Sequence, residues 1–425
     1  MRRMFVNGER EFALLQKIGF IRTAGTQEEL RAAQILLDEV KSLGISGEIE
    51  PFEIHDAQIQ QAELEVLAPY QKKYTVTAYK CAANVENLEA EFLYAEDGFE
   101  ANLADAKGKI VLVNGFLRLP LYRRLLKAGV AGFITMTGTL LDKEEETDLF
   151  TRKLRSTMQA FGRLPAVNLR ISDAFELVQK GAARVRMTVK NQDLTLTSHN
   201  VVAEIPGTKY PDQIISFGAH YDSVAFSTGV YDNGAGSVVL MELLRYFAQH
   251  PPLRTVKFMW YGSEEIGLEG SKAYVRIHEE ELKKHLFMVN VDVGGPVLGS
   301  NRCRVTAGED LLHFTQYFMK TKGHPVEVSK GIYSSDSVPF ADAGIPAINF
   351  SRDGAEGGAF IHCRNDVIDY LSPQALADTA SYVLDYADTL VNAVVFPVER
   401  EIPEDIRKEI DQYLSKKELE EAAKQ

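Results

Sequence analysis

The sequence predicts an α/β protein in which a mixed, mostly parallel sheet is flanked by helices and a smaller α/β or β-rich domain is inserted into the chain. Three observations lead to this prediction. From residue 200 onward, short uninterrupted apolar runs alternate with helical segments, as is typical of parallel strands covered by helices on both faces. Between residues 60 and 192, short strands and helices are separated by glycines. The 425 residues leave room for two or three domains.

The C-terminal half contains the elements of the main predicted domain. Strands are expected at residues 201–205, 213–219, 255–261, 286–291 and 347–350. Helices are expected at residues 235–249, 268–277, 311–320 and 373–395. We assign residues 1–59 and 193–400 to this domain, because a helix near the N-terminus and a strand-like segment at 47–54 precede the inserted region.

The N-terminal helix has a predicted start and end. Thr26 and Glu29 have capping-box spacing, in which the Thr26 hydroxyl accepts a hydrogen bond from the Glu29 amide and the Glu29 side chain reaches back. Gly44 suits the C-terminal end, because glycine readily adopts the left-handed conformation that ends many helices. The sequence therefore predicts a helix between Thr26 and Gly44.

Residues 60–192 are interpreted as an inserted, non-catalytic domain. Strands are expected at residues 74–79, 109–113, 132–136 and 184–189, with helices at 122–128 and 171–179. None of these segments gathers a set of His, Asp and Glu residues.

Residues 401–425 are expected to form a charged C-terminal helix. Ile406, Ile410, Tyr413 and Leu414 make a narrow apolar stripe that would permit docking, but a solvated terminal helix is favoured.

Composition excludes several classes of protein. Acidic residues number 60 and basic residues 47, giving a net charge of −13, which argues against binding to nucleic-acid phosphates. No apolar run approaches the ~20 residues that span a bilayer, and the N-terminus lacks the apolar core of a signal peptide. We therefore expect a cytoplasmic protein, or a secreted one if a leader has been removed. Three dispersed cysteines exclude a disulfide framework and a Cys-rich zinc knuckle.

Acidic or histidine side chains occur at five places near the ends of predicted strands, where open α/β sheets bind ligands. They are His220 with Asp222, Asp232 in a glycine-rich turn, Glu264 with Glu265, Asp292, and His362 in a late loop. Each motif alone is weak, but five of them at successive positions along one sheet edge are hard to obtain by chance.

These residues suit a pair of zinc ions. Two histidines and three carboxylates provide one His and one carboxylate for each ion, with the remaining carboxylate shared between ions about 3.5–4 Å apart. Nitrogen and oxygen ligands without sulfur fit zinc first, with cobalt or manganese as substitutes. Glu264, beside a ligand but spare, is then the natural general base acting on metal-bound water.

The same stretches resemble the two-zinc aminopeptidases of the bacterial leucyl-aminopeptidase type, a family that includes glutamate carboxypeptidases and glutaminyl cyclases. The resemblance covers residues 200–395 closely and the N-terminal helix loosely. It is carried by NVVAEIPGT, GAHYDSV, YDNGAGSVVLMELLR, FMWYGSEEIGLEGSKAYV, VNVDVGG, SSDSVPFADAGIPAINF and IHCRNDV.

The resemblance implies a role for each matching residue. His220 and Asp292 would bind one zinc ion, Glu265 and His362 the other, and Asp232 would bridge them. In the same comparison, Glu264 would be the proton shuttle, Asp222 would hold the far nitrogen of His220, and Tyr333 lies close to the position of an oxyanion-stabilising tyrosine.

The insert and two loops complete the comparison. DAKGKIVLVNGF, LLKAGVAGFITM and LPAVNLRISDAFELVQKG resemble a protease-associated domain. The chain departs from the family at Ser337, where a His is common, and at Cys363, where many members have Thr.

The predicted function is hydrolysis of N-terminal residues from peptides by a dizinc aminopeptidase. A glutamate-carboxypeptidase-like or dipeptidase activity is the alternative, because Arg352 and Arg364 lie near the site in sequence. A non-catalytic binding protein on the same scaffold is a weaker rival, since the ligand set is intact. We expect peptide substrates and no nucleic-acid or membrane partner, and the sequence leaves room for a homo-oligomer.

Overall fold

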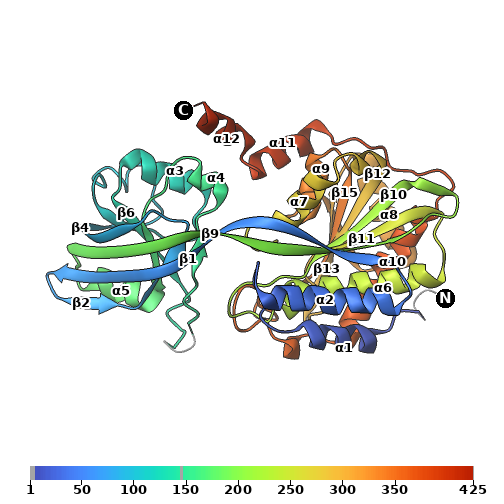
Figure 1. Cartoon of the computed structure of the whole chain (residues 1–425), viewed down its shortest axis with the longest axis horizontal. Coiled ribbons are helices and arrows are strands. Elements are labelled where there is room, and N and C mark those ends of the chain that lie inside the picture. The colour runs from blue at the N-terminus through green and yellow to red at the C-terminus, as the bar shows by residue number, and fades with distance from the viewer. Residues whose placement is uncertain (1–4, 144–146, 425) are drawn as a thin grey trace. The chain divides into compact units, whose positions relative to one another are not determined.

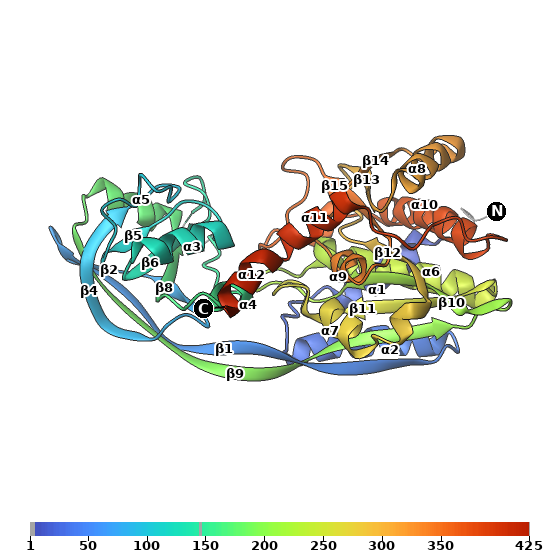
Figure 2. The ribbon, with the colours of Figure 1, turned by 90° about the horizontal axis from the view of Figure 1, so that it is seen from above.

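The computed structural model describes residues 5–143 and 147–424 and divides the chain into two compact units. The catalytic unit comprises residues 1–54 and 197–414, and the insert unit comprises residues 55–196 and 415–425. Two long strands, β1 (Gly47–Ala68) and β9 (Arg184–Ile205), pair with each other, and each contributes residues to both units (Figures 1 and 2).

The catalytic unit is built on a mixed, mostly parallel sheet with the order β14-β13-β15-β12-β10-β11-β9. Its strands are β10 (Tyr210–His220), β11 (Arg254–Tyr261), β12 (His285–Val291), β13 (Gly299–Thr306), β14 (Val326–Lys330) and β15 (Ala347–Gly354), with part of β9. Neighbouring strands are parallel except at the β9–β11 and β13–β15 pairs. The predicted fold class is therefore confirmed in this unit.

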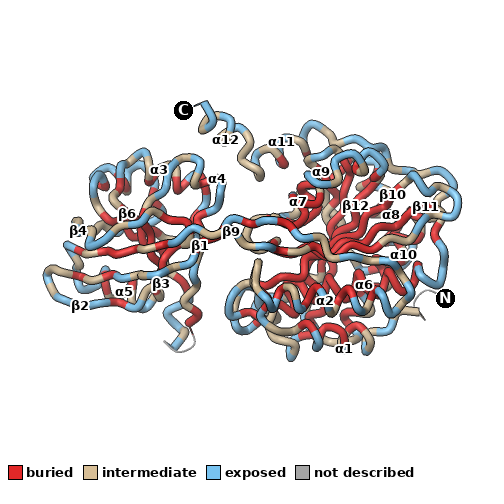
Figure 3. The backbone as a smooth tube through the Cα atoms, in the orientation of Figure 1, coloured by how far each residue is buried: buried red, intermediate tan, exposed pale blue. Residues whose placement is uncertain are grey.

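Helices cover both faces of this sheet. They are α1 (Gly8–Ile18), α2 (Gln27–Ser42), α6 (Ala235–Gln249), α7 (Glu269–Ile277), α8 (Glu309–Lys322), α9 (Ser337–Asp342), α10 (Pro373–Val391) and α11 (Glu404–Tyr413). Alternate residues of β11 enter two cores: Phe258 and Trp260 pack with α2, α6 and α10, and Met259 and Tyr261 pack with α7 and α9. β11 is buried throughout, as Figure 3 shows for the central strands.

The insert unit carries the remaining strands of the same hydrogen-bonded path, beyond β9, and has two cores of its own. Its elements are β2 (Lys72–Tyr74), β3 (Val76–Lys80), β4 (Val85–Tyr94), β5 (Ile110–Leu112), α3 (Leu119–Ala128), β6 (Gly132–Thr137), β7 (Arg152–Lys153), α4 (Ser156–Gln159), β8 (Ala166–Arg170), α5 (Ile171–Gln179) and α12 (Lys416–Ala423), with parts of β1 and β9. Val111 packs with α3, whereas Ile110 and Leu112 pack with α5, so the two helices cover opposite faces.

The charged C-terminal segment forms two helices instead of the single solvated helix expected. Ser415 has a φ of 55°, a left-handed conformation that interrupts the helical path between α11 and α12. Ile406 and Ile410 of α11 are buried against Leu268 and Val338 in the catalytic unit. The apolar stripe therefore docks, because it completes a small core that the sequence alone does not reveal.

Among the described residues, no helix combines the length and the apolar character needed to cross a membrane.

Candidate metal centre

Parallel pairing brings the predicted site residues to one edge of the catalytic sheet. β10 is parallel to both β11 and β12, so these strands end on the same side. The site residues occupy the strand ends and the loops beyond them: His220 ends β10, Glu264 and Glu265 follow β11, Asp292 follows β12, Asp232 lies in the turn Val230–Gly234, and His362 lies beyond β15. The peptide bond between Asp232 and Asn233 is cis.

Asp232 lies between two groups of metal-ligand side chains. Its Oδ1 is 3.2 Å from Nε2 of His220, and its Oδ2 is 3.1 Å from Nε2 of His362. Asp292 Oδ1 is 3.6 Å from the same His220 nitrogen, and Glu265 Oε2 is 2.9 Å from the His362 nitrogen. Within each group of three, the ligand atoms lie no more than 4.8 Å apart. One carboxylate thus presents an oxygen to each group.

Asp222 supports the site from behind. Its Oδ1 is 3.3 Å from Nδ1 of His220, the ring nitrogen that faces away from Asp232. The same carboxylate accepts hydrogen bonds from the backbone amides of Glu264 at 3.0 Å and Glu265 at 3.3 Å. A single buried side chain therefore orients one ligand ring and also fixes the backbone that carries Glu264 and Glu265.

Asp366 fixes the backbone of the turn that carries Asp232. Its carboxylate accepts hydrogen bonds from the amides of Tyr231 at 2.8 Å and Asp232 at 3.2 Å, and from the hydroxyl of Ser227 at 3.2 Å. Burial raises the pKa of Asp366 to about 6, while these backbone hydrogen bonds oppose the rise.

Arg22 is a buried supporting residue that no sequence motif indicated. It is completely buried and donates hydrogen bonds to the carbonyl oxygens of Ile18, Phe20, Tyr221, Thr228 and Gly229. These carbonyls belong to the N-terminal segment, the residue directly after β10 and the loop before Asp232. Arg22 therefore joins three parts of the chain around the site, and only a long-range contact could have revealed it.

Glu29 departs from its predicted capping role. The Thr26 hydroxyl accepts a hydrogen bond from the Glu29 amide at 3.2 Å, as the capping box requires. The Glu29 carboxylate instead accepts from the Gly25 amide at 2.9 Å and from the hydroxyls of Ser198 at 2.6 Å and Ser263 at 3.3 Å. It turns inward because these donors satisfy it in a buried position next to the loop of Glu264.

The electrostatics of the cluster favour bound cations. Burial raises the pKa of Glu264 well above its ordinary value, and the charge of Glu265 raises it further against the influence of His220. Burial also raises the pKa of Glu265 to about 7. Burial opposes ionisation of Asp232 as well, but hydrogen bonds from His220 and His362 outweigh it and lower that pKa. A positive ion at this edge would relieve the cost of burying these carboxylates together.

The donor set fits zinc. Imidazole nitrogens and carboxylate oxygens are ordinary zinc ligands, and the two groups contain no sulfur. In addition, Oε1 of Glu265 is buried without a hydrogen-bond partner among the described residues. A buried carboxylate oxygen in that state is costly, and coordination to a metal would satisfy it.

Comparison with known proteins relates part of the chain to a peptidase family. Residues 200–387 match the model of Peptidase family M28. These residues form an M28 peptidase domain. All the donors of both groups fall within them.

Several known proteins align with most of the length of this chain. Aminopeptidase YwaD of Bacillus subtilis is 27% identical over 85% of this chain and 79% of its own. Carboxypeptidase Q of Bos taurus is 22% identical over 93% of this chain and 86% of its own. The aminopeptidase from Aneurinibacillus sp. strain AM-1 superimposes with a TM-score of 0.74 and 25% identity, covering 93% of this chain and 97% of that structure.

A further structure shows the same fold. A zinc aminopeptidase from Bacillus subtilis gives a TM-score of 0.76 at 24% identity, covering 94% of this chain and 99% of its own. The predicted family resemblance is confirmed, and with it the assignment as a metal-dependent exopeptidase that acts on peptides. Zinc is the metal that these relatives imply.

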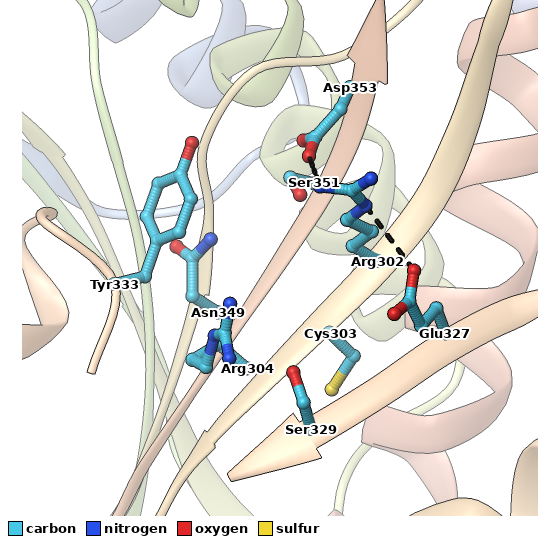
Figure 4. Close-up of a pocket in the computed structure, with 9 residues that line it drawn as sticks. All are labelled: Arg302, Cys303, Arg304, Glu327, Ser329, Tyr333, Asn349, Ser351 and Asp353. Atoms are coloured by element: carbon cyan, nitrogen blue, oxygen red, sulfur yellow. Dashed lines mark ion pairs between the residues drawn. The ribbon is translucent and has the colours of Figure 1, made fainter. Parts of the chain in front are cut away.

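Tyr333 lines a pocket in the M28 domain, between strands β13, β14 and β15 and the loop after β14 (Figure 4). The pocket also contains Arg302, Arg304 and Asp353. Burial raises the pKa of the Tyr333 hydroxyl, and the charge of Asp292 raises it further. The oxyanion role of Tyr333 stays a prediction.

Proposed function

We propose that the chain is an aminopeptidase that holds two zinc ions. His220 and Asp292 would bind one ion, Glu265 and His362 the other, and Asp232 would be shared. The position of Asp232 carries this proposal, because its two oxygens point to different histidines at 3.2 and 3.1 Å. A shared carboxylate is a common feature of sites that bind two metal ions. Cobalt or manganese would be acceptable substitutes.

Glu264 is proposed to carry the proton transfers. When bound, the zinc ions would supply positive charge that polarises the scissile carbonyl and makes water more acidic. The Glu264 carboxylate belongs to neither ligand group, and its Oε2 lies 4.0 Å from Nε2 of His220. It is placed to accept a proton from the attacking water and to deliver it to the leaving amine. Asp222 holds the Glu264 amide and so orients this carboxylate.

The surroundings of Arg352 support aminopeptidase rather than carboxypeptidase activity. Arg352 is one of the residues that the alternative would use to read a substrate carboxylate. Its guanidinium already donates to the carbonyl oxygen of Pro296 at 2.8 Å, to Oδ1 of Asn301 at 3.0 Å and to the carbonyl oxygen of Val297 at 3.3 Å. The aminopeptidase relatives point in the same direction.

A specificity for carboxylate-bearing substrates is the second candidate. Arg304 lines the pocket that contains Tyr333 and has no ion pair among the described residues. Initial rates on leucyl and glutamyl anilides, and on the same residues in N-blocked peptides, separate the two candidates. Cleavage that requires a free amino group supports the aminopeptidase, whereas cleavage of N-blocked peptides with a C-terminal glutamate supports the alternative.

The shared carboxylate is tested by counting bound zinc. The wild type and Asp232→Ala are stripped with a chelator, titrated with zinc and analysed for metal content. We expect the variant to bind two fewer equivalents at concentrations that saturate the wild type. A loss of only one equivalent would contradict the sharing of Asp232.

A further inference from the structure

A second set of metal-ligand side chains lies in the insert unit, outside the M28 domain. The set consists of His55 of β1, Cys81 in the turn after β3 and Asp193 of β9. Each offers one ligand atom, and these atoms lie within 4.8 Å of one another. All three residues belong to the same compact unit. Neither the family match nor the two catalytic groups include them.

Cys81 contributes a buried thiol that lies within 4.8 Å of the other two ligand atoms. Its exposed fraction is 0%, whereas His55 and Asp193 are exposed. Among the described residues, neither the Cys81 thiol nor the His55 ring has a hydrogen-bond partner. The cluster therefore combines an enclosed soft donor with two donors that solvent reaches, which gives an ion a route of entry.

The turn that carries Cys81 is held in place by β9. Asn191 donates from Nδ2 to the carbonyl oxygens of Tyr79 at 3.1 Å and Ala82 at 3.4 Å, on either side of Cys81. Asn84 and the backbone of Asn191 exchange hydrogen bonds of 3.0 and 2.6 Å. Cys81 itself has a φ of 61°, a left-handed conformation that this clamp maintains. The thiol is thus fixed relative to Asp193, two residues along β9.

The other two donors are supported as metal ligands commonly are. Asp193 accepts a hydrogen bond from Arg163 at 2.8 Å through Oδ2, which leaves Oδ1 for an ion. The Lys153 ammonium donates to the backbone carbonyl of His55 and fixes the strand, leaving the ring available. Hydrogen-bonded outer partners of this kind orient metal ligands.

The charge around the cluster is mixed. Lys153 and Arg163 are cationic and oppose a bound cation. Asp56, next to His55 in sequence, lies 3.8 Å from the Lys153 ammonium and 2.6 Å from that of Lys80, which offsets part of this charge. The protein would supply two negatively charged ligands to a bound ion, the Cys81 thiolate and the Asp193 carboxylate.

We propose that His55, Cys81 and Asp193 bind one divalent cation of the zinc class. Thiolate, imidazole and carboxylate are the three ligand types of zinc sites in proteins, and three protein ligands leave the fourth position for water. A soft thiolate disfavours magnesium and calcium. On binding, the Cys81 thiol loses its proton to solvent and a metal–sulfur bond forms, so binding weakens at acidic pH. The ion would tie β1, β9 and the turn after β3 together.

Cobalt(II) distinguishes this site from the catalytic one, because only this site has a sulfur ligand. The full-length protein is stripped of metal and titrated with cobalt while the near-ultraviolet thiolate-to-cobalt charge-transfer absorption is recorded. We expect one equivalent of cobalt per chain to produce that band. Cys81→Ser should abolish the band, lower the bound metal by one equivalent and leave turnover of a small aminoacyl anilide within about twofold.

Two controls isolate Cys81. Cys363→Ser should keep the band, which excludes the cysteine next to His362 as its source. Asp232→Ala should keep the band while losing catalytic metal, so failure of this proposal is distinguishable from failure of the dizinc proposal. If Cys81→Ser does not fold, Asp193→Asn and His55→Gln retain the thiol and should weaken the cobalt affinity of the band by tenfold or more. A wild type without the band, a band that survives Cys81→Ser, or unchanged affinity in the latter two variants would overturn the proposal.

Discussion

The catalytic unit and the insert unit both place helices on two faces of a sheet, but they use their strand ends differently. In the catalytic unit, the ends of β10, β11 and β12 lead into histidines and carboxylates that meet at Asp232. In the insert unit, the described ends of β5, β6 and β8 carry no such set, and the donors that do converge come from β1, β9 and a turn. An α/β architecture therefore provides positions for a site, while the residues at those positions decide whether chemistry takes place.

The sharpest form of this comparison is within the catalytic edge, between Glu264 and Glu265. Glu264→Gln should lower kcat by about 10²–10⁴-fold, because it removes a general base and preserves size. KM for a small peptide and the zinc content should change little. Glu265→Gln should weaken one zinc site as well as activity. If Glu264→Gln loses zinc while Glu265→Gln keeps all of it and loses only rate, the two roles are reversed.

Substitution of Arg22 tests how much the buried hydrogen bonds of its guanidinium stabilise the catalytic unit. Arg22→Met would remove a donor from five carbonyl oxygens, of which those of Ile18 and Gly229 keep backbone donors. Each buried acceptor left without a donor costs about 1–3 kcal/mol. We expect the free energy of unfolding to fall by at least ~3 kcal/mol, measured by urea denaturation. Arg31→Met is the matched control, because Arg31 is exposed on α2 and stacks over Phe20. If Arg31→Met lowers the free energy of unfolding as much, the loss in Arg22→Met cannot be attributed to the buried hydrogen bonds of Arg22.

Substitution of Asp222 tests how strongly its contacts with His220 and with the backbone of Glu264 and Glu265 affect metal affinity. Asp222→Asn replaces one carboxylate oxygen with an NH2 group, which cannot accept a hydrogen bond. The backbone amides of Glu264 and Glu265 then no longer each have their own acceptor oxygen. Such changes typically lower metal affinity or activity by about 10–100-fold, and zinc titration with a competing chelator measures this. Asp212→Asn, at an exposed residue paired with Lys284 at 2.7 Å, should leave zinc affinity unchanged. Equal affinities in the two variants would contradict the supporting role of Asp222.

The smallest effect is expected from the insert surface. Lys109 pairs with Glu91 at 3.1 Å and Arg184 with Glu89 at 2.8 Å, and surface ion pairs contribute about 0–1 kcal/mol. Lys109→Ala and Arg184→Ala should leave turnover of a small aminoacyl anilide nearly unchanged. Any effect should appear with longer peptides. A large loss of turnover of the small substrate, in variants that remain folded, would show that the insert supplies catalytic groups.

The predicted site residues converge at one sheet edge for a physical reason. His220, Glu265 and Asp292 lie at or just after the ends of buried apolar strands, and parallel strands bring such positions together without further information. Long-range partners could not be found in the same way: Arg22 lies in a segment without a motif, and Glu29 has a local role available that it does not fill.

The convergence of His55 with Cys81 and Asp193 likewise depends on how distant segments pair. The docking of Ile406 and Ile410 also depends on a core formed by residues remote in sequence.

The boundaries between the two units fall inside β1 and β9, at residues 54–55 and 196–197, instead of in loops. Because β1 and β9 pair with each other, a cut at either boundary would sever a strand whose backbone groups are hydrogen-bonded. Chimeras that exchange the insert with that of a related protein would need to join strands in matching register, since a one-residue slip reverses which side chains face the core. The same continuity restricts how the insert could have been gained or lost as a unit during the history of such chains.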